Sequence, residues 1–253
     1  MAKKSMRIKG GKRGQVALFV IIGIVIISAI LIFFFWVRPT YLSEGGRISG
    51  FESCVQDATE TAVDELALKG GFANPEFVYS YESQEIPYLC YTEAYYETCT
   101  VQVPFLKQNF EEQMENVLRE KINVCYDNSI NSLKSQGYDV VSGNVEYNVL
   151  AEPGVVRIEI DAPTSVGTNR FTRFNVEINS PVYEEIMIAT SVLQYETAYG
   201  DTDTSSMNAL YPEFYIDKMK RSDGTTVYAI ESKGYETKFQ FASRSLAWPA
   251  GYV

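Results

Sequence analysis

The chain has 253 residues, a net charge of −10 and no histidine. About 210 residues follow the apolar N-terminal segment, which is enough for one substantial core or two small ones. Without histidine, Ser-His and Cys-His nucleophile pairs, a histidine general base and most zinc sites are excluded.

A basic segment and then an apolar run open the chain. Residues 1–14 contain no acid and six basic residues, namely Lys3, Lys4, Arg7, Lys9, Lys12 and Arg13. Residues 16–37 then carry no charge, and as a helix they would span about 33 Å, close to the hydrocarbon thickness of a bilayer. We therefore expect a basic leader at 1–14, a hydrophobic transmembrane or filament-core helix at 15–38, and an acidic extracellular domain at 39–253.

The charge asymmetry predicts which side of a membrane each part occupies. Six of the 22 basic residues precede Gly14, so 16 basic residues face 32 acidic ones in the rest of the chain, a balance of −16. The basic end should stay cytoplasmic and the acidic body should lie outside. An acidic body repels nucleic acid, so no nucleic-acid partner is expected. The apolar run exceeds the h-region of a cleaved signal peptide and ends without a small-x-small site, at Trp36 and Pro39.

The residue pattern of the body predicts two helices, followed by strands in which apolar and polar residues alternate. Apolar residues at helical spacing predict a helix over 51–68, ended by Gly70 and Gly71, and a long helix over 104–136. Residues 72–103 show no clean period and hold six tyrosines, so irregular or short extended structure is expected there.

The second half of the body changes its period from 3.6 to two. Alternation predicts a three-stranded antiparallel meander over 145–149, 156–160 and 174–178. A helix over 181–199, a polar loop over 201–206 and three strands over 214–219, 226–230 and 238–242 should follow. The predicted fold class is therefore α+β, with amphipathic helices and antiparallel sheet in one domain or two closely packed lobes.

Four cysteines in a domain expected outside the cell favour two disulfides. Cys54 and Cys125 each lie on the apolar face of a predicted helix and are placed to meet in the core, whereas Cys90 and Cys99 enclose only eight residues. Of the three connectivities, we favour Cys54–Cys125 with Cys90–Cys99. Free buried thiols remain the alternative if the compartment is reducing.

Three other groups of residues have a functional and an ordinary interpretation. Asp201, Asp203 and Ser205 alternate as in a calcium loop, but the glycine and distant glutamate of an EF-hand are missing, so a solvated loop is favoured. The 18 tyrosines are compatible with a sugar-binding or subunit-packing surface, although ordinary packing is favoured. Carboxylate pairs such as Glu184-Glu185 and Glu111-Glu112 are expected from 32 acids by chance. No catalytic, cofactor-binding or metal residue is therefore named, no cofactor is implied, and the chain is not expected to be an enzyme.

The run Lys12-Arg13-Gly14-Gln15 before Val16-Ala17-Leu18-Phe19 resembles the class III signal peptides of archaeal type IV pilin-like proteins. The resemblance implies a prepilin-type peptidase that cuts between Gly14 and Gln15, and release of the apolar segment from the membrane into a filament of identical subunits. Phe19 stands where many bacterial pilins carry glutamate, which points to the archaeal branch. The body is similar to uncharacterised archaeal surface proteins that carry a Phe-x-x-Cys helix, here Phe51 to Cys54.

The sequence therefore predicts a structural subunit of an archaeal type IV pilus-like filament, with a membrane, a prepilin-type peptidase and copies of itself as partners. The alternative is a single-pass, membrane-anchored extracellular protein whose domain binds a partner. The mature N-terminus distinguishes the two.

Overall fold

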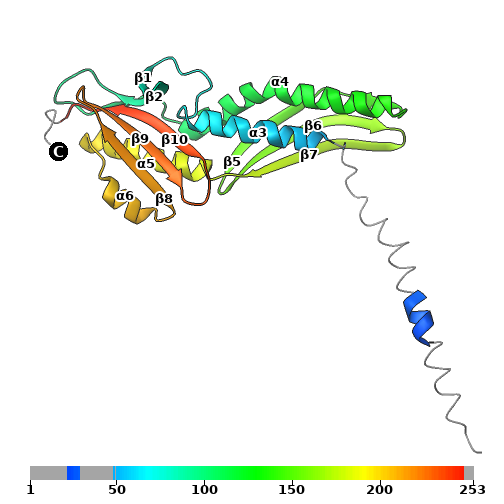
Figure 1. The fold of residues 1–253 in the computed structure, drawn as a ribbon. Coiled ribbons are helices and arrows are strands. Elements are labelled where there is room, and N and C mark those ends of the chain that lie inside the picture. The colour runs from blue at the N-terminus through cyan, green and yellow to red at the C-terminus, as the bar shows by residue number, and fades with distance from the viewer. Residues whose placement is uncertain (1–21, 29–47, 49, 248–253) are drawn as a thin grey trace, which may run out of the picture. The chain divides into compact units, whose positions relative to one another are not determined.

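The computed structural model describes residues 22–28, 48 and 50–247. The chain divides into two compact units, Met1–Gly46 and Arg47–Val253. The described part of the first unit is a helical segment over residues 22–28, drawn as the blue ribbon in Figure 1.

The expected transmembrane or filament-core helix over 15–38 is contradicted. None of the helices in the described part of the chain is both long and apolar enough to cross a membrane. Within the helical segment 22–28, Ile24, Val25 and Ile27 are 60%, 61% and 60% exposed.

Two amphipathic helices pack side by side in the second unit (Figure 1). They are α3 (Phe51–Ala67) and α4 (Leu106–Ser135), which match the predicted helices within two residues at each end. Each buries one stripe of side chains at spacings of three and four residues, as amphipathic helices do. The stripe of α4 comprises Leu106, Phe110, Met114, Leu118, Ile122, Cys125, Tyr126, Ser129 and Ile130.

The turn after α3 brings the chain against the second sheet of the unit. Gly70 has a φ of +56°, and a Cβ at this position would lie 2.7 Å from Pro87 Cγ and 2.9 Å from the Gln240 carbonyl oxygen. Both the backbone conformation and the close approach therefore require glycine.

The first sheet is antiparallel and has four strands where three were predicted. Strand β6 (Val155–Val166) is central, with β7 (Asn169–Asn179) along one side and β5 (Glu146–Glu152) and β4 (Val140–Ser142) along the other. The missed strand β4 has three residues, too few to show a period of two. The register between β6 and β7 shifts between Asp161 and Thr164, where Pro163 has no N–H to donate to the neighbouring strand.

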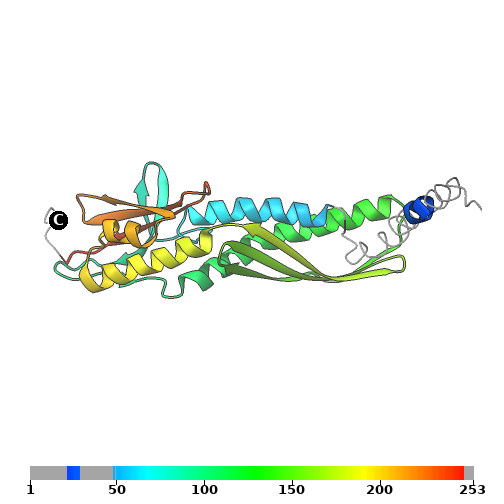
Figure 2. The same ribbon diagram turned by 90° about the horizontal axis from the view of Figure 1, so that it is seen from below.

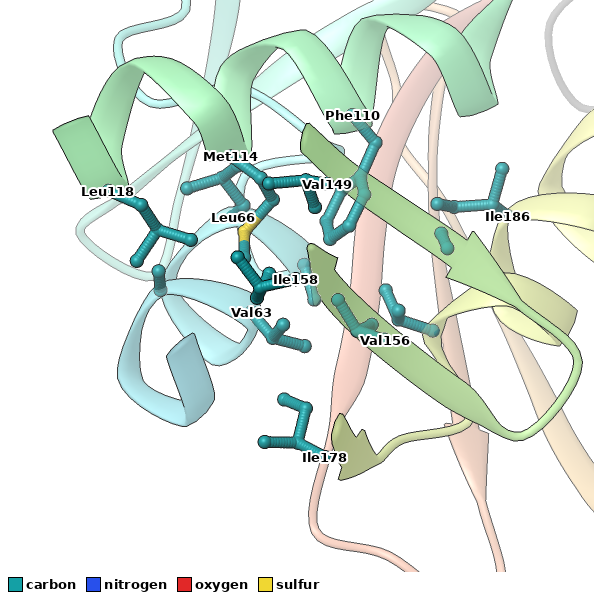
Figure 3. Packing of buried hydrophobic residues seen from close by; sticks show 14 of the residues in the cluster. Val63, Leu66, Phe110, Met114, Leu118, Val149, Val156, Ile158, Ile178 and Ile186 are labelled. Carbon is teal, nitrogen blue, oxygen red and sulfur yellow. The ribbon is translucent and has the colours of Figure 1, made fainter. Parts of the chain in front are cut away.

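Helices α3 and α4 cover the inner face of this sheet (Figure 2). Figure 3 shows Val63 and Leu66 of α3 and Met114 of α4 beside Ile158 of β6. Outward-facing residues of β6 such as Glu159 and Asp161 are exposed, whereas Val156, Ile158 and Ile160 are buried. The alternation seen in the sequence therefore reports one face in the core and one in water.

The second sheet is mixed and joins two distant parts of the chain. Its order is β1-β2-β10-β9-β8, with β3 paired to β2, and β2 and β10 run parallel while the other pairs are antiparallel. The strands are β1 (Val78–Tyr81), β2 (Gln84–Tyr91), β3 (Thr100–Val101), β8 (Phe214–Lys220), β9 (Thr225–Ser232) and β10 (Lys238–Arg244). The stretch 72–103, expected to be irregular or short and extended, thus supplies an eight-residue strand to the sheet.

Helix α5 (Val182–Tyr199) packs on the second sheet, and α6 (Thr204–Leu210) packs beside β8. The buried side chains of α5 belong to the same core as those of α3, α4 and both sheets. One continuous core therefore runs through the second unit.

Candidate functional site

The first disulfide joins α3 to α4 where the chain enters the second unit. Cys54, in the first turn of α3, is bonded to Cys125 with a Cα–Cα distance of 5.8 Å, across 71 residues of sequence. The ring of Phe51 packs edge-on against Tyr126 and Phe174, at centroid distances of 5.6 and 5.3 Å. The start of α3 is thus held by a covalent bond and by aromatic packing.

The second disulfide closes a short loop beside the second sheet. Cys90 and Cys99 are nine residues apart, with a Cα–Cα distance of 5.4 Å. The enclosed loop exposes Tyr95 and Tyr96, and Tyr96 adopts a φ of +65° while its N–H bonds to the Leu246 carbonyl at 2.8 Å. Both disulfides have the pairing that the sequence favoured, and all four cysteines are bonded in the structure.

A buried carboxylate ties α5 to the second sheet. Glu196 is 2% exposed and accepts hydrogen bonds from the hydroxyls of Tyr228 at 2.6 Å, Ser243 at 2.8 Å and Thr202 at 3.1 Å. Burial, and then the negative charge of Glu196, raise the pKa of Tyr228 well above its ordinary value, so the phenol stays protonated and donates. Because all these side chains are fully buried or nearly so, the network stabilises the fold and is closed to a substrate.

A second buried carboxylate lies near the start of α5. Glu185 is fully buried, and one of its oxygens accepts a hydrogen bond from the Thr237 hydroxyl at 3.2 Å. The other oxygen, Oε2, has no hydrogen-bond partner among the described residues. Burial raises the pKa of Glu185 to about 8, the nearby charge of Glu184 adds to this, and the Thr237 hydrogen bond opposes it. The carboxyl group is therefore mainly protonated at neutral pH.

Thr237 also lines a small open pocket of about 200 Å³. The pocket lies between α3, the segment before α5 and the β9–β10 hairpin. Its lining residues are Glu60, Val63, Asp64, Ile178, Asn179, Ser180, Tyr235, Glu236 and Thr237. The sequence analysis attributed the Glu184-Glu185 pair to chance, but Glu185 is buried behind Thr237, a lining residue of this pocket. The position of Glu185 on the inward face of the predicted helix was the sequence feature that could have indicated this burial.

The segment 201–205 has structural partners. Asp201 forms ion pairs with Lys218 and, at 3.2 Å, with Lys220. Asp203 caps α6 by accepting the Ser205 N–H at 3.0 Å, and the Ser206 hydroxyl lowers the pKa of Asp203. The calcium-loop interpretation gains no support, since the described residues contain no group of three or more acidic or cysteine side chains arranged to hold a metal. The expected loop also gives way to helix at Thr204, because Asp203 provides the N-cap.

Some aromatic side chains form a cluster apart from the main core. On the outer face of the second sheet, Phe77, Tyr79, Tyr88 and Tyr91 contact one another with ring centroids 4.6–6.1 Å apart. The three tyrosines belong to a small second core around Val227, which matches the favoured interpretation of ordinary packing. Other rings, such as those of the loop between Cys90 and Cys99, are largely exposed.

In the Glu111-Glu112 pair, Glu111 has a structural role. Its Oε1 accepts the Ala151 N–H of β5 at 2.9 Å and lies 2.6 Å from Lys107 Nζ. One turn later, Glu115 accepts the Val149 N–H at 3.2 Å. These bonds attach α4 to the edge of the first sheet.

Gly14 and Gln15, the predicted cleavage site, lie outside the described residues. The fold and its covalent links define an acidic, disulfide-linked α+β body that follows a basic and apolar N-terminal segment. Comparison of the chain with protein-family models, with curated proteins and with solved structures finds no significant match.

Proposed function

We propose that the protein is a structural subunit of a type IV pilus-like filament on the surface of an archaeal cell. In this proposal the N-terminal unit mediates assembly with copies of the same chain, and the acidic second unit faces outside. The observation that carries the proposal is the Cys54–Cys125 disulfide at the start of α3.

The position of this disulfide suits a protein that carries mechanical load. A pull on the N-terminal unit is transmitted through Gly50 to the first turn of α3, and would peel α3 away from α4 beginning at Phe51. The bond at Cys54 blocks that motion within one turn of the helix. Because the rate of forced unfolding depends on the barrier to such opening, a covalent link at the entry point is the effective place for it.

The remaining support comes from the sequence. Two disulfides persist in an oxidising environment, as expected outside the cell. The basic leader favours a cytoplasmic N-terminus during membrane insertion, and the Gly14-Gln15 junction resembles the site of a prepilin-type peptidase. The balance of −16 after residue 14 disfavours nucleic acid as a partner.

The first test is the N-terminus of native protein together with electron microscopy of the cell surface. We expect Gln15 as the first residue and filaments that contain this chain. Gly14→Asp should abolish both cleavage and assembly, whereas Gly11→Asp, the same change three residues earlier, should leave both intact. Native protein that keeps the leader and sediments as a monomer would contradict the proposal and favour a surface protein that binds a partner without assembling.

The second test addresses load. In single-molecule pulling from the N-terminal end and residue 247, the paired change Cys54→Ala with Cys125→Ala should lower the unfolding force markedly. Removing the Cys90–Cys99 disulfide by the same paired change is the matched control, because neither of these cysteines belongs to α3 or α4. Equal effects of the two paired changes would refute the mechanical role.

A further inference from the structure

An ion pair joins the segment after α5 to β8, the edge strand of the second sheet (Figure 1). The Lys218 Nζ of β8 donates to Asp201 Oδ1 and also to the Thr202 carbonyl oxygen, at 2.7 Å. The Lys218 side chain is only 12% exposed. The lysine side chains of three other ion pairs are 35–41% exposed, namely Lys107, Lys220 and Lys238. The Lys218 ammonium is therefore largely withdrawn from water and directed at one carboxylate.

A second lysine contacts the other oxygen of the same carboxylate. The Lys220 Nζ lies 3.2 Å from Asp201 Oδ2, whereas Lys218 pairs with Oδ1. The two lysines project from the same face of β8, because they are two residues apart on a strand. One oxygen of Asp201 thus faces a nitrogen that is close enough to react, and the other faces a positive charge.

The backbone beside Asp201 is fixed by buried contacts. Thr202 is fully buried, and its hydroxyl donates to the Val192 carbonyl oxygen at 3.2 Å and to the Glu196 carboxylate at 3.1 Å. Groups that a fold holds in contact react as though at effective concentrations on the order of 10⁵–10⁸ M, provided that their geometry suits attack. This range lies well above the concentration of liquid water, so condensation of a held pair can prevail over hydrolysis.

We propose that Lys218 and Asp201 condense into an intramolecular amide cross-link, with loss of one water molecule. The ammonium first passes a proton to Oδ1, and the neutral Nζ then attacks Cγ and forms the new C–N bond. The negative charge that develops on Oδ2 faces the Lys220 ammonium, as in an oxyanion hole. A second proton passes from Nζ to Oδ1, the Cγ–Oδ1 bond breaks and water leaves. No oxidant or other reactant is required.

The burial of the pair favours the product. The Asp201 side chain is 22% exposed and that of Lys218 is 12% exposed, so both charges have lost much of their hydration. Desolvation of an ion pair costs free energy, and the amide that replaces it is neutral. The cross-link would tie the edge strand β8 to the end of α5 by a covalent bond.

The test is peptide mapping of the full-length chain by mass spectrometry after reduction of the disulfides. Cleavage after Glu196, Glu213 and Glu231 places Asp201 in peptide 197–213 and Lys218 in peptide 214–231. We expect the two peptides to be joined, with a mass lower by one water molecule than their sum. Two separate peptides of full mass would show an ordinary ion pair and overturn the proposal. Peptide 197–213 lighter by one water but not joined would be a succinimide at an aspartate, which would also overturn it.

The matched variants are Lys218→Arg and Lys220→Arg. Both keep the positive charge, but a guanidinium stays protonated in proteins and cannot attack a carboxyl carbon. Lys218→Arg should yield two separate peptides, and Lys220→Arg should still yield the joined pair. The opposite result, or fragmentation that places the bond at Lys220 in the wild type, would refute the assignment of Lys218 as the nucleophile.

The rate of cross-linking tests the part of Lys220. Removing one group that stabilises an oxyanion slows enzymes by about 10²–10³-fold, and an exposed charge is worth less. Since Lys220 is 41% exposed, Lys220→Gln should slow the appearance of joined peptides after cell-free synthesis by about tenfold. Lys238→Gln is the control, because Lys238 pairs with Glu231 and should leave the rate unchanged. Equal rates for Lys220→Gln and wild type would refute the part assigned to Lys220.

The cross-link and the filament proposal can fail separately. The joined peptides come from residues 197–231, so their detection does not depend on cleavage after Gly14 or on assembly. A monomeric protein that contains the joined peptides would support the cross-link and contradict the filament. Filaments whose subunits yield only the separate peptides would do the reverse.

Discussion

The change Glu185→Gln should stabilise the protein at alkaline pH. The introduced amide would keep the size of the side chain and an oxygen that accepts the Thr237 hydrogen bond, now 3.2 Å long. It would also stay neutral at every pH, whereas Glu185 must ionise in a site without solvent. The substitution therefore mimics the protonated form that burial already favours.

The magnitude follows from the shift in pKa. The pKa of Glu185 is about 8 in the folded protein against an ordinary value of 4.5, so the folded state holds a proton that the unfolded chain releases between these values. The stabilisation from this proton is complete below pH 4.5 and is lost as the pH rises through 8. At about 1.4 kcal/mol per pH unit, the free energy of unfolding should fall by about 5 kcal/mol over this range relative to Glu185→Gln.

Urea denaturation of both proteins from pH 5 to pH 9, in amine-free buffers, measures this difference. Glu120→Gln is the matched control, because it removes a carboxylate from the exposed face of α4. We expect the curves of wild type and Glu185→Gln to converge near pH 5 and to separate up to pH 9, with Glu120→Gln following wild type. Parallel curves for all three proteins would refute the reasoning that burial holds the proton on Glu185.

Three further changes test the packing by denaturation at neutral pH. Replacing both Cys54 and Cys125 by alanine opens a 71-residue loop and should cost about 4 kcal/mol of unfolding free energy, against roughly 2.5 kcal/mol for removing the Cys90–Cys99 disulfide with its separation of nine residues. Equal costs would argue against loop entropy as the cause. Gly70→Ala should cost several times the roughly 1 kcal/mol of Gly154→Ala, because both have positive φ but only the former meets a neighbouring backbone oxygen. Tyr228→Phe should cost about 1–3 kcal/mol by removing one donor to the buried carboxylate of α5, and an unchanged midpoint would contradict that role.

The elements with a strong local period were predictable from the sequence. Helices α3, α4 and α5 begin and end within two residues of their predicted bounds, because one apolar stripe per helix is buried against the sheets. The strands β8, β9 and β10 were also predicted within two residues of their bounds. The disulfide pairing followed from the same faces, since Cys54 and Cys125 lie on the inward stripes of two helices.

Other features depend on contacts between distant residues. The parallel pairing of β2 with β10 joins segments about 150 residues apart, and nothing in either strand alone indicates its neighbour. The composition of the apolar run 16–37 predicted a membrane-spanning helix, and the described residues contain no such helix.

The sequence by itself determined the α+β class of the body and its main helices and strands, because these are encoded in the spacing of neighbouring residues. It also favoured the disulfide pairing that the structure contains. Only the tertiary structure decided which acids are buried. Glu185 and Glu184 are adjacent and chemically identical, yet Glu185 lies fully buried behind Thr237 while Glu184 does not. Burial, desolvation and the meeting of α3 with the β9–β10 hairpin at one pocket are consequences of how the chain packs, and they set the chemistry of that pocket.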